Sequence, residues 1–190
     1  KAGRFAGRTV TGKFIHGTDI HSLERQYNQG VLAIDEGVGK LIKALKETGQ
    51  YDNTLIVFGA DQGIAWGQKG FQMKLAPYDG TIRGPLIVSM PKKFPTGKVC
   101  PKPVGGADLV PTFFKAAGLE LPWKMHGRDL TPLLEKPERK DWKSPLLLAH
   151  TGMSFGEDCD EVIDMKDDPI YQKQRVPWWV SLRTDRYKYI

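Results

Sequence analysis

An acidic residue and an amide stand side by side at the end of an apolar run in this 190-residue sequence. They are Asp61 and Gln62, and Gly63 follows them. A carboxylate and a side-chain carbonyl are hard oxygen donors, which suit Ca²⁺ or Mg²⁺ better than a softer metal. The pair therefore indicates ligands of a divalent cation. Taken alone, the tripeptide is more typical of a plain turn, because Asp and Gly are ordinary turn residues.

The flanking sequence predicts where these two ligands lie. Residues 55–58 form a continuous apolar run closed by Gly59, and residues 86–88 form a second run. Such runs are typical of strands covered on both faces in a mostly parallel sheet. Ligands of these sheets gather at the carboxyl ends of the strands. We therefore expect Asp61 and Gln62 at the active-site edge of an α/β sheet.

A long helix is predicted before the first strand, from about residue 21 to residue 48. Apolar residues recur there at three- and four-residue steps, which places them on one face of a helix: Leu23, Tyr27, Val31, Ile34, Val38, Leu41 and Leu45. Gly49 stands at the preferred position for a helix end. Gly30, Gly37 and Gly39 each cost a helix about 1 kcal/mol relative to alanine, so they predict close packing of this helix against the sheet.

The second half of the sequence predicts fewer elements. Residues 108–117 favour a helix, residues 146–149 a short buried strand, and residues 178–182 a strand with one buried face. His150, at the end of the first of these strands, is more often structural than catalytic, and we assign it no role. The acidic segment 157–168 does not fit the spacing of an EF-hand and is interpreted as a solvated loop.

Asp61 and Gln62 belong to a longer series of characteristic residues at fixed spacings between positions 51 and 91. Its members are Asp52, Asn53, Thr54, Leu55, Phe58, Asp61, Gln62, Gly63, Gly67, Gly70, Lys74, Tyr78, Asp79, Arg83, Pro85 and Pro91. This series resembles the sulfatase family of the alkaline phosphatase superfamily, with its D-N-T-L-x-x-F, D-[NHQ]-G, G-x-x-G-x-x-x-K, Y-[DE] and R-x-P-L-I-V stations. The resemblance continues at residues 34–42, 108–112, 127–134 and 182–189.

The resemblance implies a fold and a division of the chain. The expected fold is α/β of the alkaline phosphatase type: a mixed, mostly parallel sheet flanked by helices, with part of a smaller C-terminal antiparallel α+β subdomain. Residues 1–140 correspond to the C-terminal part of the catalytic domain. Residues 141–190 correspond to the beginning of the C-terminal subdomain.

The resemblance also implies roles for individual residues. Sulfatases bind a divalent cation, usually Ca²⁺, between two acidic residues near the N-terminus of the whole enzyme and a pair that corresponds to Asp61 and Gln62. A family lysine that contacts the sulfate group corresponds to Lys74, whose ammonium suits charge on transferring oxygens. We predict Lys74 as a catalytic and substrate-binding residue, although a lone lysine is typical of a solvated surface. A family histidine that binds sulfate has two candidates, His16 and His21, of which we predict His16.

The nucleophile of the family is missing from this sequence. Sulfatases use a formylglycine made from Cys or Ser within C/S-x-P/A-S/C-R. The proline after Cys100 comes one position early, Cys159 has no following proline, and the segment that begins at Ser89 ends in lysine. We therefore expect the formylglycine and two acidic metal ligands in a missing N-terminal half of the same protein.

Together these features predict part of a metal-dependent sulfatase that hydrolyses sulfate esters of carbohydrate or aryl substrates, extending to N-sulfates. The fragment alone is expected to be inactive, and the resemblance implies a periplasmic, secreted or lysosomal location. Two alternatives stay open: a non-catalytic sulfatase-like binding or structural protein, and a phosphodiesterase relative in the same superfamily. The second is disfavoured because those enzymes use two zinc ions and extra histidines, which the Asp61 loop lacks.

The composition limits the classes of molecule that this protein is expected to bind. The net charge of +6 comes from 28 basic and 22 acidic residues, but the lysines are spread along the chain, which argues against a nucleic-acid partner. The same excess suits a sulfated small molecule or polysaccharide. The longest apolar stretches are far shorter than a membrane span. Cys100 and Cys159 either pair in an exported protein or stay free in a cytosolic one.

Overall fold

The computed structural model describes residues 19–151, 164, 166–167, 171 and 176–190, apart from the side chains of Gln72 and Met73. The chain divides into two compact units, Lys1–Lys92 and Lys93–Ile190. The domain boundary predicted after residue 140 stays a prediction. His16, Cys159 and most of the acidic segment 157–168 lie outside the described residues. Within the described ranges, no helix combines the length and the apolar character that crossing a bilayer requires.

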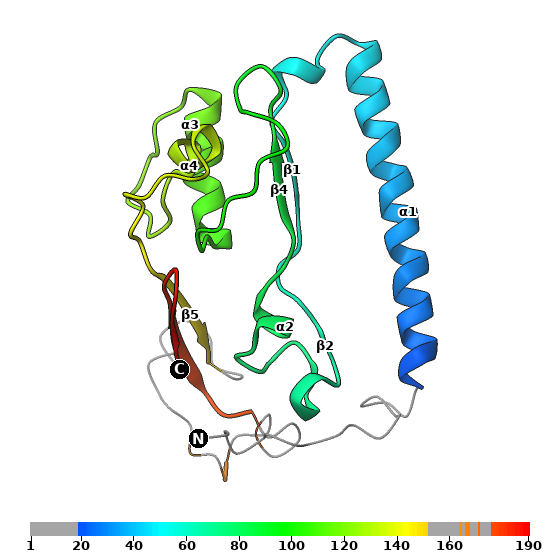
Figure 1. Ribbon diagram of the computed structural model, residues 1–190, viewed down its shortest axis with the longest axis vertical. Helices are drawn as coiled ribbons and strands as arrows, with labels where there is room; N and C mark the ends of the chain where they lie inside the picture. Colours follow the sequence, from blue (N-terminus) through cyan, green and yellow to red (C-terminus); the bar gives the residue numbers. More distant parts are fainter. Residues whose placement is uncertain (1–18, 152–163, 165, 168–170, 172–175) are drawn as a thin grey trace. The chain divides into compact units, whose positions relative to one another are not determined.

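The first unit begins with the predicted long helix, α1 (Ile20–Glu47) (Figure 1). Asp19 caps its N-terminus, because its carboxylate accepts a hydrogen bond of 2.9 Å from the backbone N–H of Ser22. Gly49 follows the helix with a left-handed φ of 70°, a conformation that favours glycine. Both ends of the helix therefore lie within a residue or two of the positions that the sequence predicts.

The packing expected of α1 is not found in the described chain. None of its residues is buried. A Cβ atom added at Gly30, Gly37 or Gly39 would meet no atom within 4 Å. The prediction of close helix–sheet packing at these glycines is therefore wrong for the described chain, and much of the apolar stripe of α1, including Tyr27 and Leu41, is exposed.

Strands β1 (Ile56–Gly59) and β4 (Leu86–Ser89) correspond to the two apolar runs. They lie side by side in Figure 1 and pair antiparallel, with Ile56 opposite Ser89 and Gly59 opposite Leu86. The expectation of a mostly parallel sheet therefore does not describe this pair. An apolar run marks a strand but carries no direction, and the connection between these two strands lacks the long crossover helix typical of a parallel pair. The pair is also partly exposed, most of all at Ile87, so it is not covered on both faces as predicted.

The connection from β1 to β4 forms a small packed body of its own. Its elements are β2 (Ala65–Trp66), η2 (Gln68–Gly70), β3 (Gln72–Met73) and α2 (Asp79–Ile82), and the 3-10 turn η1 (Tyr51–Asn53) precedes β1. Strands β2 and β3 pair antiparallel. Ala65, Phe71, Ala76 and Thr81 are buried within this body. A core inside a connection fixes the connection's shape, so its polar side chains occupy defined positions.

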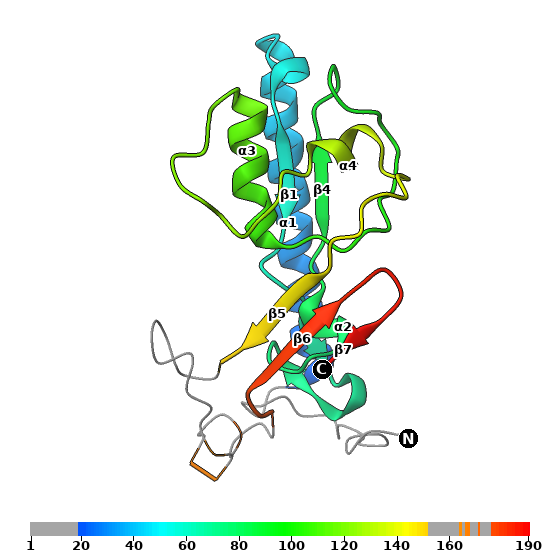
Figure 2. The ribbon, with the colours of Figure 1, turned by 90° about the vertical axis from the view of Figure 1, so that its left-hand side faces the viewer.

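The second unit contains the predicted helix and a three-stranded sheet. Its helical elements are η3 (Gly106–Asp108), α3 (Leu109–Ala117) and α4 (Thr131–Glu135). Its strands are β5 (Leu146–His150), β6 (Trp179–Arg183) and β7 (Lys188–Tyr189), all antiparallel in the order β5-β6-β7 (Figure 2). Along β6, Trp179 and Ser181 are buried while Val180 and Leu182 are exposed. The predicted strand with one buried face is confirmed, but its buried face carries Trp179 and Ser181 rather than the apolar Val180 and Leu182.

A buried carboxylate ties η3 to a distant segment of the same unit. Asp108, 2% exposed, accepts hydrogen bonds from the backbone N–H of Gly105 at 2.9 Å and of Arg128 at 2.8 Å. The Arg128 guanidinium donates two more, from Nε at 3.2 Å and from Nη2 at 3.1 Å. A Cβ at Gly127 would lie 1.8 Å from the carbonyl oxygen of Ala107, so only glycine allows this approach. The Asp108–Arg128 pair is therefore part of the architecture of this unit.

Candidate functional site

Two of the four predicted site residues, Asp61 and Lys74, meet in the structure. The Lys74 Nζ atom lies 2.8 Å from Oδ2 and 3.0 Å from Oδ1 of Asp61. Asp61 follows the carboxyl end of β1, and Lys74 directly follows β3. The ammonium therefore contacts both carboxylate oxygens, and this contact links two parts of the connection between β1 and β4.

The position of Asp61 depends on glycines that permit close backbone contacts. The backbone N–H of Gly63 donates to the Thr81 carbonyl at 2.8 Å. A Cβ at Gly63 would lie 2.4 Å from the Gly80 carbonyl oxygen and 2.6 Å from that of Arg83. At Gly84, a Cβ would lie 2.8 Å from the carbonyl oxygen of Ala60. A glycine is therefore required at position 63 because two backbone segments approach closely there.

Thr81 is a supporting residue that the sequence analysis did not single out. It is 1% exposed, and its hydroxyl lies within hydrogen-bond distance of the carbonyl oxygens of Ala76 and Tyr78. The ring of Tyr78 packs on Phe71 with centroids 5.5 Å apart. A threonine three residues after Tyr78 is the local signal, because Ser and Thr side chains often bond to carbonyls a few residues earlier.

The charges of the site are exposed and mutually stabilised. The hydrogen bond from Lys74 lowers the pKa of Asp61, and the backbone N–H of Gln62, 2.8 Å from Oδ1, lowers it further. The Asp61 side chain is 70% exposed and that of Lys74 is 40% exposed. Asp61 is therefore an ionised carboxylate at neutral pH, and solvent reaches the ion pair that it forms.

The donor set fits part of a divalent-cation site. Asp61 and Gln62 offer neighbouring hard oxygens, which is the ligand chemistry of Ca²⁺ and Mg²⁺. Ca²⁺ takes about 6–8 oxygen ligands, and the described residues contain no group of three or more His, Cys, Asp or Glu side chains that could hold a metal. These two residues can therefore supply a portion of a coordination shell that needs further ligands.

The histidine candidates are not brought to this site by the described structure. His16 lies outside the described residues. His21 is on the first turn of α1, where its Nδ1 lies 3.7 Å from a carboxylate oxygen of Glu24. His16 as a sulfate contact therefore stays a prediction.

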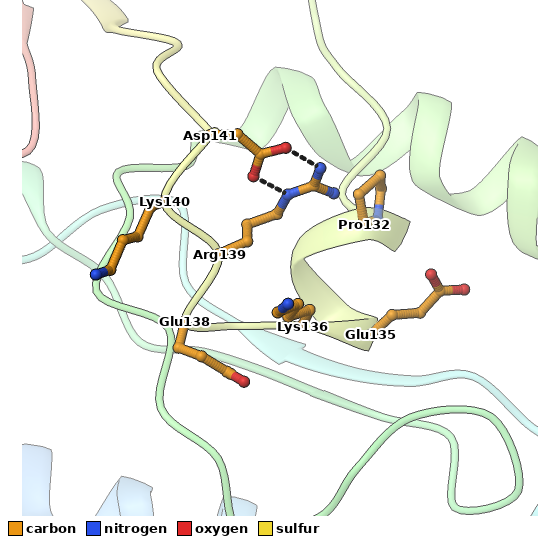
Figure 3. A pocket seen from close by; sticks show the side chains of 7 residues that line it. All are labelled: Pro132, Glu135, Lys136, Glu138, Arg139, Lys140 and Asp141. Atoms are coloured by element: carbon orange, nitrogen blue, oxygen red, sulfur yellow. Dashed lines mark hydrogen bonds and ion pairs between the residues drawn. The ribbon is translucent and has the colours of Figure 1, made fainter.

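A cavity of about 680 Å³ in the second unit does not contain the predicted site residues. Acidic and basic side chains both line it, and in Figure 3 the side chains of Arg139 and Asp141 point toward one another. The guanidinium donates from Nε to Oδ1 at 2.7 Å and from Nη2 to Oδ2 at 2.5 Å, which lowers the pKa of Asp141 to about 2. Arg139 is therefore paired with Asp141, and we assign this cavity no role.

Comparisons with known proteins identify the family of this chain. The sequence model of the Sulfatase family matches residues 4–119. An N-acetylglucosamine-6-O-sulfatase of Bacteroides thetaiotaomicron is 35% identical over 184 residues, which cover 84% of this chain and 33% of that protein. The chain thus spans about a third of the length of this curated relative.

Solved structures of related enzymes also resemble this chain. A protein whose structure is solved in complex with its substrate D-glucosamine-2-N,6-O-disulfate is 29% identical, with a TM-score of 0.63 over 83% of this chain and 29% of the other. A phosphonate monoester hydrolase from Silicibacter pomeroyi is 30% identical, with a TM-score of 0.64 over 82% of this chain and 29% of the other. These likenesses confirm the alkaline-phosphatase-like α/β fold. With the matched family model and the curated relative, they show that this chain belongs to the sulfatase family of the alkaline phosphatase superfamily.

Proposed function

We propose that the full-length protein is a metal-dependent sulfatase in which Asp61, Gln62 and Lys74 form one side of the active site. The observation that carries this proposal is the contact between Lys74 and Asp61, at 2.8 and 3.0 Å. The contact brings a cation suited to a sulfate group beside a carboxylate suited to a metal. Each comes from a separate part of a connection with its own packed core.

Asp61 and Gln62 would hold Ca²⁺, or Mg²⁺, through their side-chain oxygens. A bound divalent cation polarises an ester oxygen and stabilises charge that develops on it. Lys74 would contact a sulfate oxygen, where its ammonium stabilises negative charge in the transition state. Gly63 and Thr81 would act through these residues, since they fix the backbone from which Asp61 and Lys74 project.

We place the formylglycine nucleophile and the remaining acidic ligands in a part of the protein that this chain does not contain. The proposal is supported by the coverage of only about a third of the relative's length and by the lack of the C/S-x-P/A-S/C-R signature in these residues. The exposed apolar residues of α1 and the exposed Ile87 of β4 give that missing half a surface to cover. The family resemblance supports a periplasmic, secreted or lysosomal location.

The substrate that the comparisons favour is a sulfated amino sugar. One relative is an N-acetylglucosamine-6-O-sulfatase, and one similar structure holds a glucosamine with both an N-sulfate and an O-sulfate. A second candidate is a phosphonate or phosphate ester, because the likeness to a phosphonate monoester hydrolase is as strong. A non-catalytic sulfatase-like protein is the third candidate.

One experiment separates these three candidates. The full-length protein is incubated with N-acetylglucosamine 6-sulfate and with an aryl phosphonate monoester, and released sulfate and phenol are measured. Faster turnover of the sulfate ester supports the proposal, faster turnover of the phosphonate supports the second candidate, and no turnover of either supports the third. The isolated 190 residues should hydrolyse neither, and sulfate release by them would contradict the assignment of the nucleophile to a missing part.

A matched pair of variants tests the metal assignment. Asp61→Ala should weaken Ca²⁺ binding, measured by calorimetry, by about 100-fold or more, since even loss of an outer-shell partner costs about 10- to 100-fold. Turnover should fall together with the affinity. Asp52→Ala is the control, because Asp52 forms an exposed ion pair with Lys92 in the same unit. Equal Ca²⁺ affinity in the two variants would remove Asp61 from the metal site.

A further inference from the structure

We propose that Lys74 is an internal counter-ion of Asp61 in the metal-free protein, and that binding of a divalent cation releases its ammonium to the sulfate group. The proposal rests on the function proposed above and adds a coupling between its two sites. Cation binding and sulfate binding would then strengthen one another through the movement of one side chain.

The first step of the argument is that the ammonium and the metal compete for the same atoms. Lys74 Nζ lies 2.8 and 3.0 Å from the two oxygens of Asp61. Ca²⁺ binds carboxylate oxygens at roughly 2.3–2.6 Å, so it would occupy nearly the same space. An ammonium and a metal ion that contact the same two oxygens would also repel each other strongly. The observed contact is therefore incompatible with a metal bound to both oxygens of Asp61.

The second step is that the ion pair is easily exchanged. Its partners are 70% and 40% exposed, and exposed ion pairs contribute little free energy because water screens them. Lysine carries its charge on a flexible four-carbon stem, so the ammonium can move without a change in the backbone. The backbone at Asp61, in contrast, is fixed by the close contacts of Gly63 with Gly80 and Arg83.

The third step is that neighbouring cations already have other partners. Lys69 Nζ lies over the ring of Tyr78, 5.2 Å from its centroid. Lys92 Nζ lies 3.5 Å from Asp52. Lys74 is therefore the lysine whose partner changes when a metal binds at Asp61. Once released, its three N–H donors are available to an anion.

The coupling has a defined thermodynamic form. If a bound cation raises the affinity for sulfate by freeing Lys74, then bound sulfate must raise the affinity for the cation by the same factor. Part of any coupling comes from direct attraction between the metal and sulfate, and that part does not depend on Lys74. The difference between the wild-type protein and a Lys74 variant isolates the contribution of the side chain.

Calorimetric titration of the full-length protein with Ca²⁺ tests the competition. Lys74→Met removes the counter-ion and should tighten Ca²⁺ binding by about 2- to 5-fold, the range expected for an exposed ion pair. Lys74→Arg keeps a cation beside Asp61 and should bind Ca²⁺ as the wild type does. Lys92→Met removes a lysine of the same unit that pairs with Asp52 instead, and it should leave the affinity unchanged.

A second titration uses inorganic sulfate, with and without saturating Ca²⁺. Ca²⁺ should increase sulfate affinity in the wild type, and the increase should be smaller in Lys74→Met. Ca²⁺ affinity that is unchanged or weaker in Lys74→Met, while Asp61→Asn abolishes binding, would overturn the counter-ion and leave the proposed function standing. No Ca²⁺ binding by the wild type, or equal binding by Asp61→Asn, would overturn both.

Discussion

The two compact units each contain a carboxylate paired with a cation, and the two pairs differ in burial. In the first unit, the side chains of Asp61 and Lys74 are 70% and 40% exposed. In the second unit, those of Asp108 and Arg128 are 3% and 25% exposed. Asp61 has one side-chain partner and one backbone partner, whereas Asp108 accepts four hydrogen bonds from Gly105 and Arg128.

This difference indicates different roles for chemically similar pairs. A buried carboxylate with all its lone pairs occupied cannot exchange partners without leaving charge in a medium of low dielectric constant, which is costly. An exposed carboxylate with a mobile lysine can exchange its partner for a metal at little cost. The first pair therefore suits binding and chemistry, and the second holds segments of its unit together.

The largest expected effect is on the stability of the second unit. Asp108→Ala should lower the free energy of unfolding by about 3–5 kcal/mol, because it leaves the Arg128 guanidinium partly buried without its carboxylate. Urea unfolding followed by circular dichroism measures the change. Asp141→Ala, which breaks the exposed pair with Arg139, is the control and should barely move the midpoint. Equal shifts in the two variants would contradict the role given to burial.

The next effect is on catalysis rather than on stability. Lys74→Ala in the full-length protein should lower kcat for a sulfate ester by about 100- to 1000-fold, the range for loss of one group that stabilises transition-state charge. Its unfolding midpoint should stay at the wild-type value, because the pair is exposed. Steady-state kinetics and a thermal melt measure the two quantities. Wild-type kinetics in this variant would defeat the assignment of Lys74.

A smaller effect is expected from the backbone contacts below the exposed pair. Gly63→Ala would place a methyl group 2.4 Å from the Gly80 carbonyl oxygen, and such overpacking costs about 1–3 kcal/mol. Gly80→Ala is the matched control, since nothing lies within 4 Å of a Cβ there. Ca²⁺ affinity should fall in the first variant and not in the second. The opposite order would show that the loop adapts to a side chain at position 63.

The smallest effect concerns pH. Lys74 lowers the pKa of Asp61 from its ordinary value of 3.8, so Lys74→Met should raise it toward that value. A depressed carboxylate pKa stabilises the folded state above the unfolded pKa, and this contribution is lost as pH falls through the folded value. It should therefore disappear below about pH 4. NMR titration of the Asp61 carboxyl carbon measures the shift, and an unchanged pKa in the variant would show that the pair does not persist in solution.

Local patterns in the sequence were sufficient for most of the helices and strands. The apolar stripe and the Gly49 stop predicted α1 to within a residue or two, and the aromatic and apolar residues 178–182 predicted β6. The same patterns failed where the answer depended on partners far away in the chain. The glycines of α1 predicted a packed face that is open, and the apolar runs of β1 and β4 gave no strand direction.

Some features of the candidate site could likewise be predicted from local sequence, and others depended on the tertiary structure. The residue types at Asp61, Gln62 and Lys74, and their register with neighbouring glycines, determined the family and the predicted chemistry, because ligand type and local turn geometry are written in short segments. Only the tertiary structure brought Lys74 onto Asp61 and placed Gly63 against Gly80 and Arg83. It also separated an exposed, exchangeable ion pair from a buried one, because burial depends on how distant segments pack together.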